Sequence, residues 1–131
     1  MRNDERGSRC DDGGLVPEEV ERILLAYERF LWAECGRSPH TRRAYLGDVR
    51  DLLAHARRVG AQAPADLTLT ILRDWLAAMT ATGLARATVA RRAASARSFT
   101  GWLHRTGRSP VDVGIRLGSP RAARTLPGVL R

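Results

Sequence analysis

The chain has 131 residues, 44% of them hydrophobic, which suits one folded domain with tails. Its net charge is +8 and all 22 basic residues are arginine, which favours a polyanionic partner, with nucleic acid ahead of an acidic membrane. No apolar run approaches the roughly 20 residues that span a bilayer, so we expect no membrane segment, and the charged first residues predict no secretory signal. Cys10 and Cys35 form no CxxC pair and have no histidine at zinc spacing, so free thiols in the cytoplasm are expected.

The positive charge lies mainly in the second part of the chain. Residues 1–35 hold 5 arginines against 9 acidic residues, whereas residues 36–131 hold 17 arginines against 5 acidic residues. This asymmetry favours a nucleic-acid partner. The alternative is a solvated arginine-rich surface that binds nothing.

The first predicted element is a helix over residues 17–35. Residues 1–15 before it are polar and are expected to form a disordered tail. Pro17 suits the first helical position, and Gly36 suits a helix end. The apolar residues between them recur at helical spacing and are expected to face the core: Ile23, Leu24, Tyr27, Phe30 and Leu31.

The second predicted helix runs from Pro39 to about residue 59. Ser38 is a suitable N-cap, Pro39 a suitable first residue and Gly60 a suitable stop. One side of this helix is apolar, which predicts that it packs on the core. On the other side, arginines recur every seven residues and are expected to line up as one stripe: Arg43, Arg50 and Arg57.

Two more helices are predicted on either side of Gly83, the second over residues 86–106. The face of that helix opposite the core is expected to hold Arg91, Ser95 and Trp102. Because no segment shows strand-like alternation, the sequence predicts an all-α domain over residues 16–107, with four helices packed as two crossed hairpins. Residues 108–131 are rich in proline, glycine and arginine and are expected to be a basic linker.

Two segments of the chain are similar to each other, namely residues 36–45 and residues 83–92. Each contains a glycine, then a threonine five residues later, then an Arg-Arg pair. In each, the glycine can end one helix and the residues after it can begin the next. The second arm of each predicted hairpin therefore carries arginines, which suits an anionic and repetitive partner.

These segments carry a resemblance to a known family. Residues 36–52 resemble the start of the second helix, and residues 83–99 the fourth helix, of the N-terminal core-binding domain of tyrosine recombinases of the Xer type. Residues 119–130 resemble the linker that enters the catalytic domain. The resemblance implies a four-helix SAM-like domain that forms half of a clamp on duplex DNA, with its second and fourth helices facing the DNA. The helix over 17–35 would face away and could contact a neighbouring protomer.

The residues expected to bind DNA are arginines on these two helices and small polar residues at their starts. Arginine binds phosphate, and the free N–H groups and hydroxyls of a first helical turn can do so as well. The candidate residues are His40, Thr41, Arg42, Arg43, Arg50, Arg57, Arg86, Thr88, Arg91, Arg92 and Arg97.

The chain is not expected to be an enzyme by itself. The family's chemistry needs a nucleophilic tyrosine with Arg, His and Lys groups. The resemblance places all of these in a C-terminal catalytic domain, which is expected to begin after the residues of this chain. The sequence contains no lysine, and Tyr45 falls in the motif as a core residue. We expect no cofactor, metal or small-molecule substrate. The alternative functions are a small helical protein-interaction module, whose contact surface would be the helix over 17–35, and, less favoured, a helix-turn-helix regulator.

Overall fold

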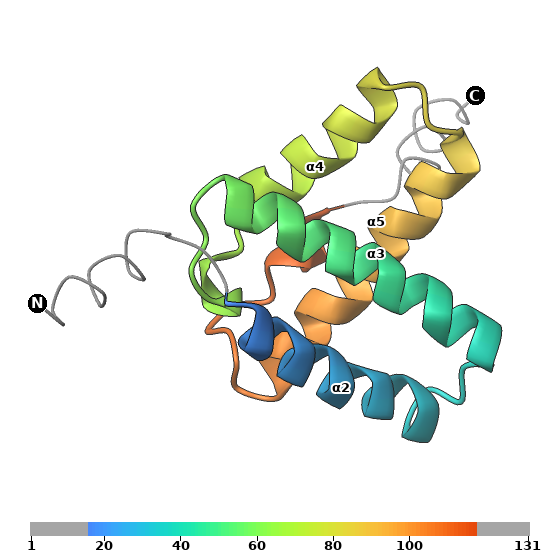
Figure 1. The fold of residues 1–131 in the computed structure, drawn as a ribbon, viewed down its shortest axis with the longest axis vertical. Coiled ribbons are helices and arrows are strands. Elements are labelled where there is room, and N and C mark those ends of the chain that lie inside the picture. The colour runs from blue at the N-terminus through green and yellow to red at the C-terminus, as the bar shows by residue number, and fades with distance from the viewer. Residues whose placement is uncertain (1–15, 118–131) are drawn as a thin grey trace, which may run out of the picture.

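The computed structural model describes residues 16–117 (Figure 1). Every regular element in that range is helical, which confirms the all-α, four-helix prediction. The expected tail over residues 1–15 and the expected linker residues 118–131 lie outside the described residues. The elements are α2 (Pro17–Ala33), α3 (Pro39–Arg58), the 3₁₀ turn η1 (Pro64–Asp66), α4 (Leu69–Ala81), α5 (Arg86–Arg105) and the 3₁₀ turn η2 (Val113–Arg116).

The helices form two hairpins that cross. Helices α2 and α3 lie side by side, and α4 and α5 form the second hairpin, with α5 passing behind α3 in the view of Figure 1. Helix α3 is the central element, because it packs against α2, α4 and α5. The two helices expected to face DNA are therefore in direct contact with each other.

The helix starts follow from local side-chain chemistry. The Ser38 hydroxyl accepts a hydrogen bond from the Thr41 N–H at 3.2 Å, and Thr68 accepts one from the Ile71 N–H at 3.1 Å. Helix α5 begins after Ala85, whose side chain cannot cap it. An uncapped start of this kind forgoes about 1 kcal/mol of helix stability.

The core is centred on an aromatic cluster between α2 and α5. The Tyr27 and Phe99 ring centroids are 5.1 Å apart at 75°, and the Tyr27 and Trp102 centroids are 5.3 Å apart. Such aromatic pairs contribute about 0.5–1.5 kcal/mol beyond the area they bury. The prediction that Trp102 and Ser95 lie on the outer face of α5 is wrong, because both are buried. The reason is that α5 is covered on several sides, by α2, α3, α4 and η2.

The domain also extends further than the sequence indicated. Residues 108–117, expected to belong to the linker, pack on α4 and α5 through η2. Gly114 and Leu117 are buried there, and Ser109 donates a hydrogen bond to the Val111 carbonyl at 2.9 Å. The predicted domain end at Gly107 relied on helical periodicity, which the docked residues Gly114 and Leu117 do not have.

Candidate nucleic-acid interface

The start of α3 presents polar groups to solvent. His40 is exposed and Thr41 is half-buried, next to the capping Ser38. The Arg42 guanidinium is held locally, since its Nη1 donates to the Arg37 carbonyl at 2.9 Å. The Arg37 guanidinium itself lies 5.2 Å above the ring centre of Tyr45. Pro39 has no N–H, and Ser38 accepts from the N–H groups of Thr41 and Arg42. Of the first helical residues, His40 keeps an N–H without a partner within residues 16–117, and this N–H can bind an anion.

The start of α5 is similar in its exposure. Arg86 is exposed and Thr88 is half-buried, and no side chain of the described residues caps the helix. Within residues 16–117, Arg86 forms no ion pair. The Thr88 N–H bonds to the Ala85 carbonyl, so within residues 16–117 the N–H groups of Arg86 and Ala87 are left without a backbone partner. Both helix starts have a threonine in the first turn.

The contact between α3 and α5 is organised by a buried carboxylate that the sequence reasoning missed. Asp48 is 1% exposed and accepts hydrogen bonds from Arg91 Nε at 2.9 Å, Arg91 Nη2 at 2.5 Å and Ser95 Oγ at 2.7 Å. Arg92 Nε lies 3.2 Å from Asp48 Oδ1, an ion-pair distance without hydrogen-bond geometry. The hydrogen bonds that Arg91 donates to Asp48 raise the pKa of the Arg91 guanidinium, whereas burial acts in the opposite direction. The sequence does contain a sign of this site, because Asp48 is an acidic residue between Tyr45 and Leu52 on the apolar side of the helix.

A second carboxylate on α3 extends the network to α4. Asp51 accepts a hydrogen bond from Trp75 Nε1 at 2.9 Å and another from Arg92 Nη1 at 3.2 Å. The Asp51 side chain is half exposed, whereas the Asp48 side chain is buried. The two carboxylates together connect α3 with α4 and α5.

Several candidate residues share the helix sides that meet at this crossing. Thr41 is seven residues before Asp48, and Thr88 is seven residues before Ser95, so each lies on the side of its helix where α3 and α5 meet. His40 is three turns before Asp51 and lies on the same side. We call this set the crossing surface: His40, Thr41, Thr88, Arg91 and Arg92.

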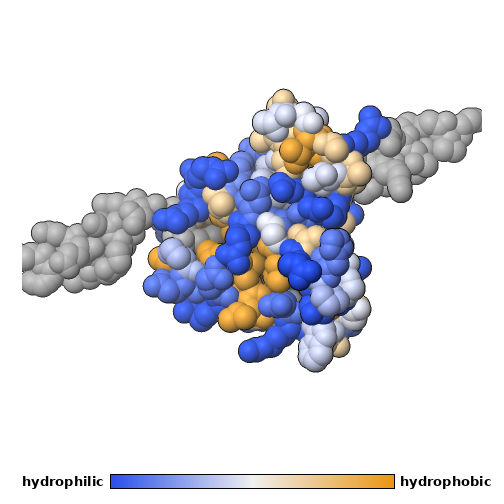
Figure 2. All heavy atoms as spheres, turned by 45° about the vertical axis from the view of Figure 1, so that its right-hand side comes forward, coloured by the Kyte–Doolittle hydropathy of each residue, from blue (hydrophilic) through white to orange (hydrophobic). Residues whose placement is uncertain are grey.

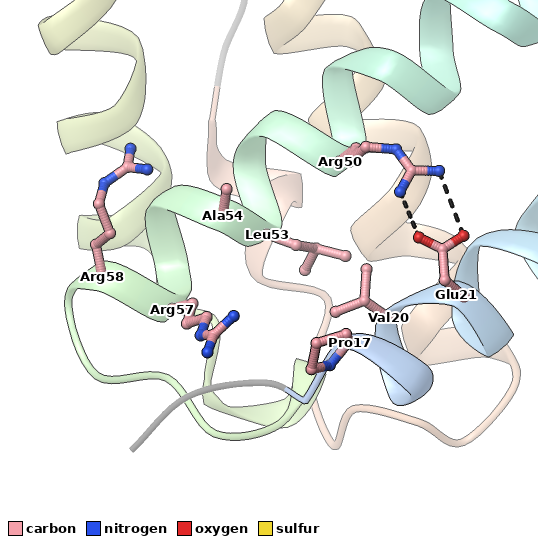
Figure 3. Close-up of a pocket in the computed structure, with 8 residues that line it drawn as sticks. All are labelled: Pro17, Val20, Glu21, Arg50, Leu53, Ala54, Arg57 and Arg58. Atoms are coloured by element: carbon pink, nitrogen blue, oxygen red, sulfur yellow. Dashed lines mark hydrogen bonds and ion pairs between the residues drawn. The ribbon is translucent and has the colours of Figure 1, made fainter. Parts of the chain in front are cut away.

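The stripe of arginines on α3 lies elsewhere. Arg50 forms an ion pair with Glu21 of α2, and both line a groove of about 640 Å³ together with Arg57 (Figure 3). Arg43 shares this side of α3 through its spacing of seven. The hydrogen bond from Arg50 lowers the pKa of the Glu21 carboxyl, and the same bond raises the pKa of Arg50. The arginine stripe, expected on the side of α3 away from the core, therefore borders α2. The spacing of seven shows that the arginines share one side of the helix, but it does not show which element lies next to that side.

Arg97 belongs to neither surface. Its Cα would lie 3.3 Å from a Cβ placed on Gly114, so this part of α5 is covered by η2. Its Nη1 is buried and has no hydrogen-bond partner within residues 16–117. The structure thus separates Arg97 from the crossing surface.

The outer surface is mostly hydrophilic in the view of Figure 2, with smaller hydrophobic patches between polar side chains. Within residues 16–117, no helix has the length and apolar character needed to cross a membrane. In the same range, no three His, Cys, Asp or Glu side chains gather as metal ligands.

Comparison with known proteins places this domain in a family. The family model described as phage integrase, N-terminal SAM-like domain, matches residues 24–107. The tyrosine recombinase XerC of Mycobacterium tuberculosis (strain ATCC 25177 / H37Ra) is 48% identical over 112 residues, which cover 86% of this chain and 37% of that protein. The tyrosine recombinase XerC of Mycobacterium sp. (strain KMS) is 49% identical over 114 residues, which cover 86% of this chain and 38% of that protein.

The chain spans little more than a third of the length of these relatives. No solved structure matches it significantly. The family match covers most of the described residues and includes all of α3, α4 and α5. The chain therefore belongs to the phage integrase N-terminal SAM-like domain family.

Proposed function

We propose that this chain binds duplex DNA as the core-binding domain of a site-specific tyrosine recombinase, in DNA recombination or integration. Its relatives are tyrosine recombinases, and residues 36–131 carry 17 arginines against 5 acidic residues. The charge supports a large phosphate-dependent part of the affinity. We also propose that the protein works in the cytoplasm.

The observation that carries the proposal is the crossing of α3 and α5. There Arg91 of α5 binds Asp48 of α3, and Thr41 and Thr88 in the first turns of the two helices each lie two turns before a residue of this contact. Phosphate contacts from such groups would fix the position of the domain on DNA, and the first turns of the helices would reach base edges in the major groove. The crossing surface is therefore our first choice for the DNA contact. The border arginines, Arg43, Arg50 and Arg57, are the second.

We further propose that this chain alone does not cleave DNA. Both tyrosines of the sequence lie in the described part. Tyr27 is fully buried and donates a hydrogen bond to Ser98 Oγ at 2.8 Å, and Tyr45 is half-buried under Arg37. Neither is placed to attack a phosphodiester. Strand exchange would need the catalytic Arg, Lys, His and Tyr residues of the family.

Contact with other recombinase protomers through α2 is the second part of the proposal. Helix α2 exposes two large apolar side chains seven residues apart, Leu25 at 56% and Trp32 at 63%. They share one side of the helix. An exposed apolar pair of this kind suits a protein contact. This same observation is what favours the alternative function, a protein-interaction module without DNA affinity.

Fluorescence anisotropy with a labelled duplex, titrated over a range of salt concentrations, tests DNA binding. If about five phosphates are engaged, log K should fall against log salt with a slope of roughly −4 to −5. Arg91→Gln/Arg92→Gln should make the slope shallower by about 2, because two positive charges are lost. Glutamine is chosen because its amide N–H can still donate to the buried Asp48 carboxylate. The matched control, Arg50→Gln/Arg57→Gln, removes the same charge and should leave the slope almost unchanged.

Two outcomes would contradict this assignment. If the wild-type domain does not bind duplex DNA even at low salt, the protein-interaction module becomes the better function. If only the control variant changes the slope, DNA lies against the border of α3 with α2 and not on the crossing surface. Thermal melting by circular dichroism establishes that each variant is folded.

A further inference from the structure

The buried carboxylate of Asp48 is the least expected feature of the helix contact. Removing a charge from water is costly, and an apolar residue could fill the space between two helices without that cost. Asp48 nevertheless lies among the buried apolar residues on the inner side of α3 and is 1% exposed. Packing alone therefore does not account for a carboxylate at this position.

The geometry of Arg91 shows what the carboxylate does. Arg91 uses one edge of its guanidinium, Nε and Nη2, to bind both oxygens of Asp48. A guanidinium has five N–H donors, so the edge that contains Nη1 keeps its donors. Within residues 16–117, no other acceptor binds Arg91, and its side chain is 42% exposed. One edge is therefore fixed to the protein while the other faces solvent.

Ser95 fixes the carboxylate in turn. Its hydroxyl donates to Asp48 Oδ2 at 2.7 Å, and Ser95 is fully buried on α5. The carboxylate thus has one orientation, and so does the guanidinium bound to it. A long arginine side chain normally loses rotamer freedom when it binds a ligand, and a side chain ordered in advance loses less.

We propose that Asp48 is a positioning residue for DNA recognition, which holds Arg91 so that its free guanidinium edge meets a DNA phosphate beside the crossing of α3 and α5. This inference rests on the proposed function. The free edge matches the two-oxygen geometry of a phosphate group. In the proposed complex, the Arg91 guanidinium lies between the DNA phosphate and the Asp48 carboxylate, and Ser95 binds the carboxylate.

The sign of a mutational effect tests this role. Asp48 carries a negative charge, which by simple electrostatics repels DNA, so a role of charge alone predicts that Asp48→Asn binds DNA more tightly. Positioning predicts the opposite: about tenfold weaker binding, with the salt slope shallower by about 1 because one phosphate contact is lost. The matched control is Asp74→Asn on α4, which removes the same charge from an exposed carboxylate without an ion pair within residues 16–117 and should not weaken binding.

A second variant keeps the test decisive if Asp48→Asn does not fold. Arg91→Lys keeps the charge and an ion pair with Asp48, but an ammonium cannot bind a carboxylate and a phosphate along two fixed edges. We expect about tenfold weaker binding with an intact thermal melt. Arg91→Lys binding as tightly as wild type would overturn the proposal.

A double-mutant cycle separates positioning from general damage to the fold. If Asp48 acts through Arg91, then Arg91→Lys should cost no further affinity in the Asp48→Asn background. Effects that multiply would overturn the proposal. Wild-type binding is measured first, because its absence would refute the proposed function itself. If the wild type binds DNA and Asp48→Asn binds it more tightly, only the role of Asp48 is refuted.

Discussion

At the residue scale, the ionisation of Tyr27 is strongly coupled to folding. It is fully buried beside Phe99 and Trp102, and its hydroxyl donates to Ser98. Burial raises the pKa of Tyr27 far above its usual value, because the phenolate would lose its hydration. The unfolded chain ionises near pH 10 while the folded chain keeps the proton, so stability falls as pH rises above 10.

Substitution of Tyr27 by Phe tests this coupling. Between pH 10 and pH 11.5, the wild-type domain should lose up to about 1.4 kcal/mol of unfolding free energy per pH unit from this group. Tyr27→Phe should lack that part of the pH dependence, although it is about 1 kcal/mol less stable at pH 8 without the hydrogen bond to Ser98. Urea unfolding at several pH values provides the measurement. Parallel curves for the two proteins would show that Tyr27 ionises normally.

At the element scale, the docking of η2 depends on a close approach to α5. A Cβ on Gly114 would lie 2.2 Å from Thr100 Oγ1 and 3.3 Å from the Arg97 Cα. The second of these atoms is backbone and cannot move aside. We therefore expect Gly114→Ala to destabilise the domain by about 1–3 kcal/mol through overpacking.

The control for this substitution is Gly47→Ala on α3. A Cβ on Gly47 meets no atom of residues 16–117 within 4 Å, and alanine is the better helix former by about 0.5–1 kcal/mol. The melting temperature should therefore fall in Gly114→Ala and rise in Gly47→Ala, although the chemical change is the same. A Gly114→Ala domain that melts at the wild-type temperature would mean that η2 is not docked in solution.

The helices were predictable because their signals are local. Ser38, Pro39 and Thr68 set helix starts, and each of the four helices is followed within three residues by a glycine with positive φ. The docking of residues 108–117 was not predictable, because it depends on the fit of Gly114 against a distant turn of α5. Local patterns do not contain that information.

The candidate site was predictable only in part for a related reason. The threonines and arginines at the starts of α3 and α5 could be chosen from sequence, and they remain predictions as DNA contacts. The period of seven in the α3 arginines identified one side of a helix, but only the fold shows Glu21 opposite Arg50. The role of Asp48 likewise depends on Arg91 and Ser95, more than forty residues away.

At the scale of the whole molecule, the acidic residues of α2 provide a test of how the domain approaches DNA. Glu18 and Glu34 are exposed near opposite ends of α2, and neither forms an ion pair within residues 16–117. If α2 faces away from DNA, these charges act only through the long-range field. Glu18→Gln/Glu34→Gln raises the net charge by two without touching the crossing surface.

This variant should change the association rate and leave the dissociation rate alone. Long-range attraction speeds encounter, whereas dissociation depends on the contacts in the bound state. Stopped-flow measurements should show a few-fold faster association at low salt, and the difference should shrink near physiological salt as screening shortens the field to about 8 Å. Arg91→Gln should instead speed dissociation. A changed dissociation rate in Glu18→Gln/Glu34→Gln would contradict this and place α2 against the DNA. The exposed Leu25 and Trp32 of α2 would then be unavailable to another protomer.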